Sequence, residues 1–425
     1  MQSTEQKIER AALAGLAAAC MDERERSTEV SLAELAALVE TAGGQPVATL
    51  LQSKPTPDPR TFLGEGKVAE LRERIVANDC DLAVFDNELS PSQMRVLEEE
   101  LGVRVLDRSG LILDIFAQRA QTREGQLQVE LAQYQYLLPR LTGMWTHLTR
   151  QNAAGGKSPI GTRGPGETQL ETDRRHIRRK IAKLTEDLEE VRRVRSTQRQ
   201  RRQKNEIPVV AIVGYTNVGK STLLNQLTGA NIPANNRLFD TLDTTTRTLE
   251  ISDTCTVLLS DTVGFIRKLP HHLVEAFKAT LEELSFADLL LHVIDASNPE
   301  WREQAAVVDQ LILELGAEKT PRIEIFNKCD LWTGEIRPHG ENIVSISAKT
   351  GEGLDRLLAA IGERLDTGAK RVTIHLPYDK GGLVERLYQE AKVEKVDYGE
   401  TIDVVAVCTP KTIGQLGPLV EGWQP

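Results

Sequence analysis

The chain has 425 residues and a formal net charge of −10, and 40% of its residues are hydrophobic while 27% are charged. This length exceeds what one compact core supports and favours about three or four domains, and the composition is that of a globular protein. Five cysteines lack the paired spacing of a disulfide framework or a zinc site, and no apolar run reaches the roughly 18–20 residues of a membrane span. We therefore expect a cytosolic protein, and we take it to be monomeric.

Residues from about 31 to 111 alternate between strand-like and helix-like segments. The apolar runs and helical periodicities follow each other at residues 46–51, 66–76, 82–85 and 91–101. Gly102 ends the second helical segment. The alternation predicts a small α/β domain with a partly parallel sheet, which we assign to residues 1–112. The Ala-rich stretch 8–21 lacks the basic start of a secretory signal, so we do not expect export.

A long helical region should follow, which we assign to residues 113–205. One helix is expected from Leu113, interrupted by Pro139 and Gly143, and a second from Glu167 to Gln203, with a Gly-rich loop at 153–167 between them. Two such helices form an antiparallel hairpin. Between residues 174 and 204 the chain carries 13 Lys or Arg against four Asp or Glu, although the whole chain is acidic.

A βα alternation begins after Pro208 and defines a domain at residues 206–366. The pattern G-x-x-x-x-G-K-[ST] lies between an apolar strand and an amphipathic helix, where backbone N–H groups and a helix N-terminus bind phosphates. The expected phosphate-binding residues are Gly214, Tyr215, Thr216, Asn217, Val218, Gly219, Lys220, Ser221 and Thr222. Lys220 would contact the β- and γ-phosphates, and the Ser221 hydroxyl would ligate Mg²⁺.

A D-x-x-G motif follows the next apolar strand, at Asp261, Thr262, Val263 and Gly264. We expect Asp261 to hold Mg²⁺ through water, and the Gly264 N–H to contact the γ-phosphate.

Two further motifs select the base. Asp330 accepts hydrogen bonds only, which suits the two adjacent donors of guanine, while the Lys328 stem covers the base and Asn327 braces the loop. Ser347, Ala348 and Lys349 form a second element, in which the Ala348 N–H would donate to the guanine carbonyl. Four motifs in this order predict a GTP-binding and GTP-hydrolysing domain.

The segment FDTLDTTTR at 239–247 is the expected first switch. A threonine there should ligate Mg²⁺ with Ser221 and Asp261. The sequence does not choose among the three consecutive threonines; Thr246 is our first choice and Thr245 the second, and Phe239 is placed at the nucleotide.

Two residues bear on the rate of hydrolysis. Phe265 follows Gly264 where Ras-like enzymes carry a water-orienting glutamine, so intrinsic hydrolysis should be slow. Asn217 lies in the phosphate loop, where some related GTPases use an asparagine to hold K⁺; otherwise it is an amide that braces the loop. The catalytic set is therefore Lys220, Asp261, Gly264, Thr246 and Asn217.

These motifs, preceded by GTRGPGETQLETDRR, resemble the HflX family of ribosome-associated GTPases. The resemblance implies that the N-terminal domain and hairpin bind the large ribosomal subunit and that stalled ribosomes are split or rescued with GTP. It assigns Arg163, Gly164, Pro165, Gly166 and Glu167 to the tip of the hairpin loop, and Arg174, Arg175, Arg178 and Arg179 to RNA phosphates.

The chain departs from the family at Asp240 and Thr244, where alanine and proline are usual. Some members are reported to bind ATP through the N-terminal domain; the only hint here is residues 64–67, Gly-Glu-Gly-Lys, which also suit an ordinary capping turn.

Two other functions remain open. The hairpin of a signalling GTPase could bind a protein partner, such as a membrane protease, at the membrane periphery. A GTP-dependent RNA-modification factor is less favoured, because no Cys or His cluster offers that chemistry. A final small α/β domain is expected at residues 367–425, with strands at 372–376 and 402–408 and a helix at 383–392.

Overall fold

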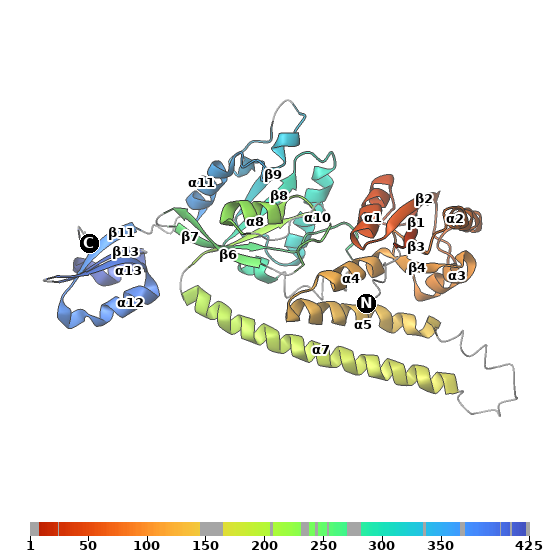
Figure 1. Ribbon diagram of the computed structural model, residues 1–425, viewed down its shortest axis with the longest axis horizontal. Coiled ribbons are helices and arrows are strands. Elements are labelled where there is room, and N and C mark those ends of the chain that lie inside the picture. Colours follow the sequence, from red (N-terminus) through yellow and green to blue (C-terminus); the bar gives the residue numbers. More distant parts are fainter. Residues whose placement is uncertain are drawn as a thin grey trace, which may run out of the picture. The chain divides into compact units, whose positions relative to one another are not determined.

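The structure is a computed structural model of the chain (Figure 1). It describes residues 8–23, 25–144, 165–204, 207–230, 238–242, 245–252, 255–269, 282–334, 337–365, 370–399, 401–408 and 410–421. Close contacts group the chain into two units. The first comprises Met1–Val191, Asn235–Asp243 and Gly264–Ala279, and the second Arg192–Ala234, Thr244–Val263 and Thr280–Pro425. The four domain ranges given above stay predictions.

The first unit is built on a four-stranded sheet in the order β2-β1-β3-β4. Its strands are β1 (Arg10–Ala18), β2 (Gln45–Lys54), β3 (Leu82–Phe85) and β4 (Arg104–Asp107). Every pairing among them is parallel, so the sheet is more regular than the partly parallel one we expected. The sequence did not predict β1, because its Ala-rich composition gives little strand signal.

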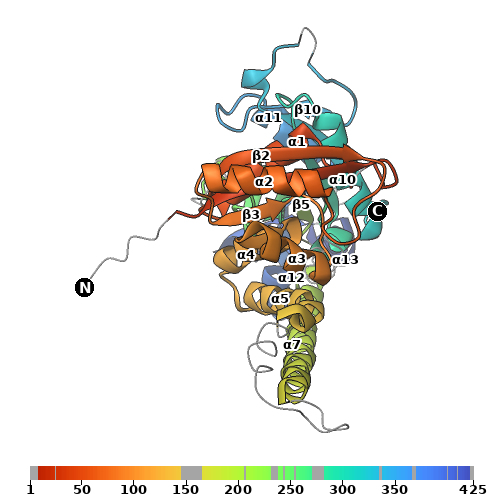
Figure 2. The same ribbon diagram turned by 90° about the vertical axis from the view of Figure 1, so that its right-hand side faces the viewer.

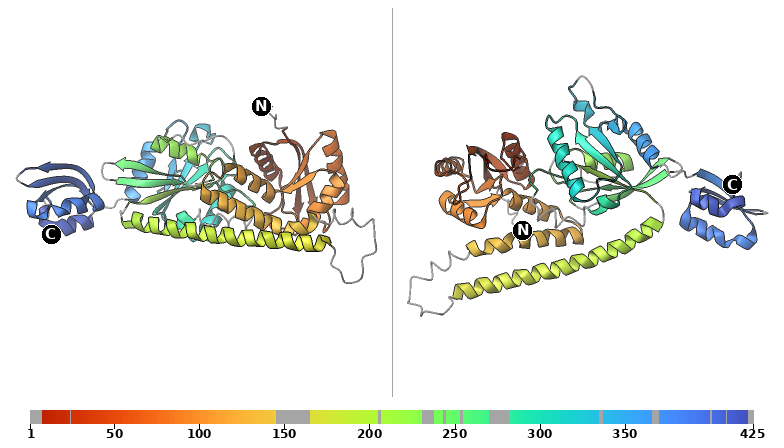
Figure 3. Two further views of the ribbon diagram at one scale, coloured as in Figure 1. Left: turned by 60° about the horizontal axis from the view of Figure 1, so that its bottom comes forward. Right: turned by 180° about the vertical axis from the view of Figure 1, so that it is seen from behind.

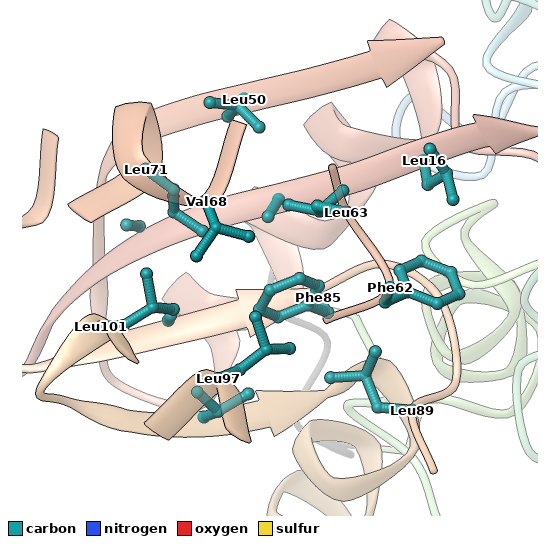
Figure 4. Packing of buried hydrophobic residues seen from close by; sticks show 14 of the residues in the cluster. Leu16, Leu50, Phe62, Leu63, Val68, Leu71, Phe85, Leu89, Leu97 and Leu101 are labelled. Carbon is teal, nitrogen blue, oxygen red and sulfur yellow. The ribbon is translucent and has the colours of Figure 1, made fainter. Parts of the chain in front are cut away.

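Helices cover both faces of this sheet. They are α1 (Glu29–Thr41), α2 (Glu65–Ala77), α3 (Pro91–Leu101) and α4 (Arg108–Arg119). α2 and α3 pack on one face, which Figure 2 shows from the front, and α1 and α4 pack on the other. Between the sheet and α2 and α3, Leu71, Phe85 and Leu97 are fully buried (Figure 4). Burying each of these side chains stabilises the fold by roughly 1.5–3 kcal/mol.

The helical hairpin consists of α5 (Arg123–Met144) and α7 (Pro165–Lys204), which run side by side in Figure 3. Leu131 of α5 packs against Leu184 and Leu188 of α7, and Lys180 Nζ donates to Tyr134 Oη at 2.7 Å. These contacts run antiparallel, as expected.

The expected ends of the hairpin helices were partly wrong. The first expected helix is in fact two helices, since α4 ends at Arg119 and α5 begins at Arg123. Pro139 and Gly143 do not interrupt α5, which continues to Met144. α5 tolerates the proline because Tyr136 and Arg140, on either side of it, are both bonded to Asp107.

The assignment of the loop tip is also corrected in part. Pro165, Gly166 and Glu167 form the first turn of α7 rather than the loop, which fits the preference of proline for the first helical position. Arg163 and Gly164 lie outside the described residues.

The second unit contains a six-stranded sheet in the order β10-β9-β8-β5-β7-β6. The strands are β5 (Val209–Gly214), β6 (Thr245–Ser252), β7 (Cys255–Asp261), β8 (Leu289–Asp295), β9 (Arg322–Asn327) and β10 (Ile343–Ser345). Only β6 is antiparallel to its described neighbour, so the mostly parallel sheet is confirmed. Its flanking helices are α8 (Lys220–Thr228), α10 (Trp301–Glu314) and α11 (Leu354–Arg364), with 3₁₀ turns at Glu282–Phe286 and Cys329–Leu331. The motif residues Gly214, Asp261 and Asn327 therefore end parallel strands at one edge of the sheet, where such folds bind ligands.

The C-terminal part is a three-stranded antiparallel sheet in the order β11-β13-β12. It comprises β11 (Lys370–Leu376), α12 (Gly382–Glu390), β12 (Lys392–Tyr398), β13 (Ile402–Cys408) and α13 (Pro410–Leu416), with 3₁₀ turns at Tyr378–Lys380 and Gly417–Leu419. The expected helix to residue 392 was two residues too long, and β12 was not predicted, because an irregularity between Val393 and Lys395 breaks its alternation. Across the described residues, no helix combines the length and apolar character needed to cross a bilayer.

Candidate nucleotide-binding site

Two glycines let the phosphate loop pass close to its neighbours. A Cβ on Gly219, whose φ is +95°, would lie 2.4 Å from Asn327 Nδ2, and one on Gly214 would lie 2.4 Å from the Val293 carbonyl oxygen. Any larger residue would clash at either position. The loop can therefore turn its N–H groups inward, with α8 beginning directly behind it at Lys220.

Asn327 ties three motifs together. Its Nδ2 donates to the Val218 carbonyl at 2.8 Å, and its Oδ1 accepts from the Ala348 N–H at 2.9 Å. These bonds connect the phosphate loop to the Ala348 loop through Asn327. The Ala348 N–H donates to Asn327 in this structure, and its bond to the guanine carbonyl stays a prediction.

Lys220 is a buried cation directed at the loop. Its Nζ donates to the carbonyl oxygens of Gly214 at 3.1 Å and Tyr215 at 2.7 Å. Burial lowers the pKa of Lys220 to about 8, and the nearby carboxylate of Asp261 opposes that shift. A phosphate at this place would restore the charge that burial disfavours.

This pKa predicts a pH dependence of nucleotide binding. A lysine with a pKa of about 8 loses its proton as pH rises through that value, whereas in the complex the phosphates hold the proton. The dissociation constant for GDP should therefore be flat near pH 7 and rise towards about tenfold per pH unit above 8. Calorimetric titration from about pH 7 to about pH 9, with circular dichroism to verify folding, measures this; a flat profile would contradict it.

Ser221 and Asp261 come together as the Mg²⁺ hypothesis requires. Ser221 Oγ donates to Asp261 Oδ2 at 2.7 Å, and the Asp261 side chain is fully buried at the end of β7. Next to it, Thr262 Oγ1 donates to the Ile212 carbonyl at 2.7 Å and fixes the strand end. A hydroxyl and a carboxylate oxygen are ligands that suit Mg²⁺, so these residues fit that ion.

The base-reading loop is also held in place. Lys328, at φ +61°, donates through Nζ to the Asn217 carbonyl at 2.9 Å and to Asp295 Oδ2 at 2.7 Å. Ser347 Oγ donates to Asp330 Oδ1 at 2.7 Å, which orients the exposed carboxylate. The sequence analysis did not predict a role for Asp295. The available signal was that Asp295 ends β8 on the face whose other residues, Leu289, Leu291 and Val293, are all apolar.

Most of the remaining nucleotide candidates have buried side chains, namely Tyr215, Thr216, Val218 and Val263. Lys349, next to Ala348, is exposed. Thr222 lies in the first turn of α8. Gly264 leads into the second switch, in which Phe265 and Ile266 are buried in the first unit.

The first switch lies partly in a strand. Thr245 and Thr246 lie within β6, paired with Asp261 and Ser260 of β7. The ring of Phe239 packs against Phe116 of α4, so its place at the nucleotide stays a prediction.

The second switch is held by a buried polar network in the first unit. Lys268 Nζ lies 2.5 Å from Asp86 Oδ2, and Arg108 contacts the other oxygen of Asp86 at 2.8 Å. Ser27 and Ser31 also donate to Asp86 Oδ2, at 2.7 and 2.8 Å. Burial alone would raise the pKa of Asp86, but Arg108 and Lys268 hold it below its ordinary value.

The basic candidates lie along α7. Arg175, Arg178 and Arg179 are exposed, and Arg174 is half-buried. Their side chains thus present charge to solvent on one helix.

Family models match most of the chain. A model described as "GTP-binding GTPase N-terminal" matches residues 29–117, and one described as "GTP-binding GTPase Middle Region" matches 119–202. A "50S ribosome-binding GTPase" model matches 209–328, and an "HflX C-terminal domain" model matches 336–406.

Curated relatives carry the same family name. The chain is 49% identical to the GTPase HflX of Caldanaerobacter subterraneus, over 88% of this chain and 86% of that protein, and 46% identical to that of Escherichia coli K12, over 86% of each. A solved GTP-binding protein of Sulfolobus solfataricus in complex with GDP is 24% identical, with a TM-score of 0.44, over 84% of this chain and 99% of that chain. With the phosphate loop, the Ser221–Asp261 pair and the Asp330 loop in place, this chain belongs to the HflX family of GTPases and is a GTP-binding, GTP-hydrolysing protein.

Proposed function

We propose that this GTPase binds the large ribosomal subunit in the cytosol through its helical hairpin and, with GTP bound, splits or rescues stalled ribosomes. The observation that carries the proposal is the exposed row of Arg175, Arg178 and Arg179 on α7, within a chain that is acidic overall. The description of the model matched by residues 209–328 as a 50S ribosome-binding GTPase supports it.

Arginine suits this role because its planar guanidinium pairs with phosphate through two parallel hydrogen bonds. On an acidic protein, a concentrated basic helix overcomes the general repulsion from RNA and sets the orientation of binding. A signalling GTPase that uses the hairpin for a protein partner would not need phosphate-directed charge.

Co-sedimentation with large subunits and a non-hydrolysable GTP analogue tests the proposal. Replacing Arg174, Arg175, Arg178 and Arg179 by Gln should weaken binding by at least about a hundredfold and reduce the slope of log K against log salt by about 3. The matched control replaces four exposed arginines outside the hairpin, namely Arg72, Arg302, Arg371 and Arg386. Equal binding by both variants would overturn the RNA role and favour a protein partner.

For the metal, we propose that Mg²⁺ is held by Ser221, Asp261 and a threonine of the first switch, with Thr246 as the first choice and Thr245 as the second. Both threonines lie in β6 and pair with β7, the strand that ends at Asp261, and Thr246 Oγ1 lies 3.4 Å from Ser260 Oγ. A hydroxyl oxygen is a ligand of the kind that Mg²⁺ prefers.

Single alanine variants discriminate between these threonines. Thr246→Ala should raise the Mg²⁺ concentration that gives half-maximal GTP hydrolysis by about tenfold or more, because one oxygen ligand is lost. Thr248→Ala, at an exposed threonine of the same strand, is the matched control and should change it by less than about twofold. A tenfold rise for Thr245→Ala with a normal Thr246→Ala variant would move the ligand to Thr245, and no rise for either would contradict the proposal.

We also propose that K⁺ beside Asn217 supplies positive charge during hydrolysis. Asn217 has a φ of +61°, and its carbonyl is bonded to Lys328, so the loop holds it in an unusual conformation. Phe265 cannot orient water, so another source of transition-state stabilisation is needed. GTP hydrolysis should be at least about tenfold faster in K⁺ than in Na⁺, and Asn217→Ala should abolish the difference; equal rates would contradict it.

A further inference from the structure

We propose that Asp295 and Ser297 are positioning residues for guanine nucleotides, because they hold Lys328 between the base-reading loop (residues 327–330) and the phosphate loop. All the contacts that carry this proposal lie within the second unit. The proposal goes beyond the ribosomal function and does not depend on it. It rests on the expected contact between the Lys328 stem and the guanine ring, which a variant of Lys328 tests separately.

Asp295 lies between the two strands that carry the nucleotide motifs. It is the last residue of β8, which pairs with β5 before the phosphate loop and with β9 before the base-reading loop. In the register of the sheet, Asp295 stands opposite Asn327, the first residue of the base-reading motif. The Asp295 side chain is only 12% exposed, so its charge needs a partner close by.

That partner is Lys328, which reaches from one loop to the other. Its Nζ donates to Asp295 Oδ2 at 2.7 Å and to the Asn217 carbonyl, in the phosphate loop, at 2.9 Å. Together the two bonds fix the end of a flexible four-carbon stem. Lys328 and Asn217 each have a φ of +61°, which is uncommon for residues other than glycine and needs support from neighbouring contacts. The Lys328 bridge therefore joins two constrained residues of different motifs.

Ser297 orients the Asp295 carboxylate. Its backbone N–H and its Oγ both donate to Asp295 Oδ1, at 3.0 and 2.6 Å. Because Ser297 holds Oδ1, Oδ2 is directed at Lys328. A carboxylate accepts at both oxygens, whereas an amide has one acceptor and would place its NH₂ group against either Ser297 or Lys328. Asp295→Asn would therefore keep the shape of the side chain but lose the bridge.

A lysine held in this way should slow the release of nucleotide. Covering the base with a side chain that is already ordered loses less conformational entropy than ordering it on binding. Without the bridge, the Lys328 stem would sample several rotamers and cover the base for only part of the time. Changes at a binding site act mostly on the dissociation rate, so the loss should appear as faster release of GDP.

A double-mutant cycle in the full chain tests the proposal through the release rate of a fluorescent GDP. Asp295→Asn and Lys328→Met, which keeps an apolar stem, should each speed release by about tenfold. The double variant should be no more than about twofold faster than the faster single variant, because both changes remove the same bridge. Asp309→Asn, at an exposed carboxylate paired with Arg322 in the same unit, is the matched control and should resemble the wild type.

A second readout separates positioning of Lys328 from a general loosening of the base-reading loop. Inosine diphosphate lacks the exocyclic amine that Asp330 is expected to bind, so the preference for GDP over inosine diphosphate reports on Asp330. In Asp295→Asn this preference should stay within about twofold of the wild-type value, whereas a loosened loop would lower it.

Release rates that multiply to about a hundredfold in the double variant, or a reduced preference for GDP in Asp295→Asn, would overturn the proposal. Normal release from Lys328→Met beside fast release from Asp295→Asn would also overturn it, because Asp295 would then act by another route. If Lys328→Met impairs folding, Ser297→Ala supplies the test at an exposed side chain. It removes one of two donors to Asp295 and should speed release by about threefold, while an unchanged rate would contradict the proposal.

Discussion

Replacing Asp330 by Asn should lower the affinity for GTP by roughly a thousandfold, because an amide cannot accept from both guanine donors. In the structure, Ser347 Oγ donates to Asp330 Oδ1 at 2.7 Å and so directs the carboxylate. An asparagine there offers one donor and one acceptor. That pattern matches xanthine, which carries an oxygen where guanine carries the exocyclic amine.

The measurement is competition against a fluorescent guanine nucleotide, for wild type and Asp330→Asn, with GDP and XDP. The variant should prefer XDP, and the wild type GDP. Asp355→Asn, an exposed carboxylate in the first turn of α11, is the control and should leave both affinities unchanged. Unaltered GDP binding by Asp330→Asn would show that another group reads the base.

Replacing Asp86 by Ala should destabilise the first unit by about 3–5 kcal/mol, because the substitution removes the carboxylate that pairs with the buried Lys268 and one of the two, with Glu34, that pair with Arg108. Arg108 is 2% exposed and the Lys268 side chain 5% exposed, and both contact Asp86. The loss should also free the second switch, since Lys268 is only four residues from Gly264.

The contribution of Asp86 to stability should depend on pH. The folded pKa of Asp86 lies below the ordinary value of 3.8, so its stabilising effect is complete above that value and is lost as pH falls below it. Urea unfolding of wild type and Asp86→Ala at neutral pH and near pH 3 measures the free energy of unfolding of each protein. The difference between the two free energies should be smaller near pH 3. Glu73→Ala, an exposed carboxylate in α2, is the control; an equal, small change in both variants would refute the role of Asp86.

Local signals predicted much of the fold. Residues 82–85 and 91–101 form β3 and α3 within the expected bounds, and Gly102 closes α3 with a φ of +73°. Those segments carry a clean apolar run or a capping residue, whose physics is local. The strands β1 and β12 were not predicted because neither shows a clear period-two pattern. β1 is rich in alanine, and β12 contains an irregularity in its register.

The contacts that position the switches could not be predicted from sequence. Phe239 meets Phe116, and Lys268 meets Asp86, across more than a hundred residues of chain in each case. No spacing rule links such residues, because the fold alone brings them together. For the same reason the sequence did not place Thr246 within β6, which only the strand pairing reveals.

The central claim is that one site, built from the phosphate loop, Lys220 and the Asp330 loop, selects guanine nucleotides. Titrating the purified full chain with GDP and with ADP by calorimetry tests it most directly. The account predicts one GDP bound per chain and at least about a thousandfold weaker binding of ADP at that site. Comparable affinities for the two nucleotides at this site would contradict it.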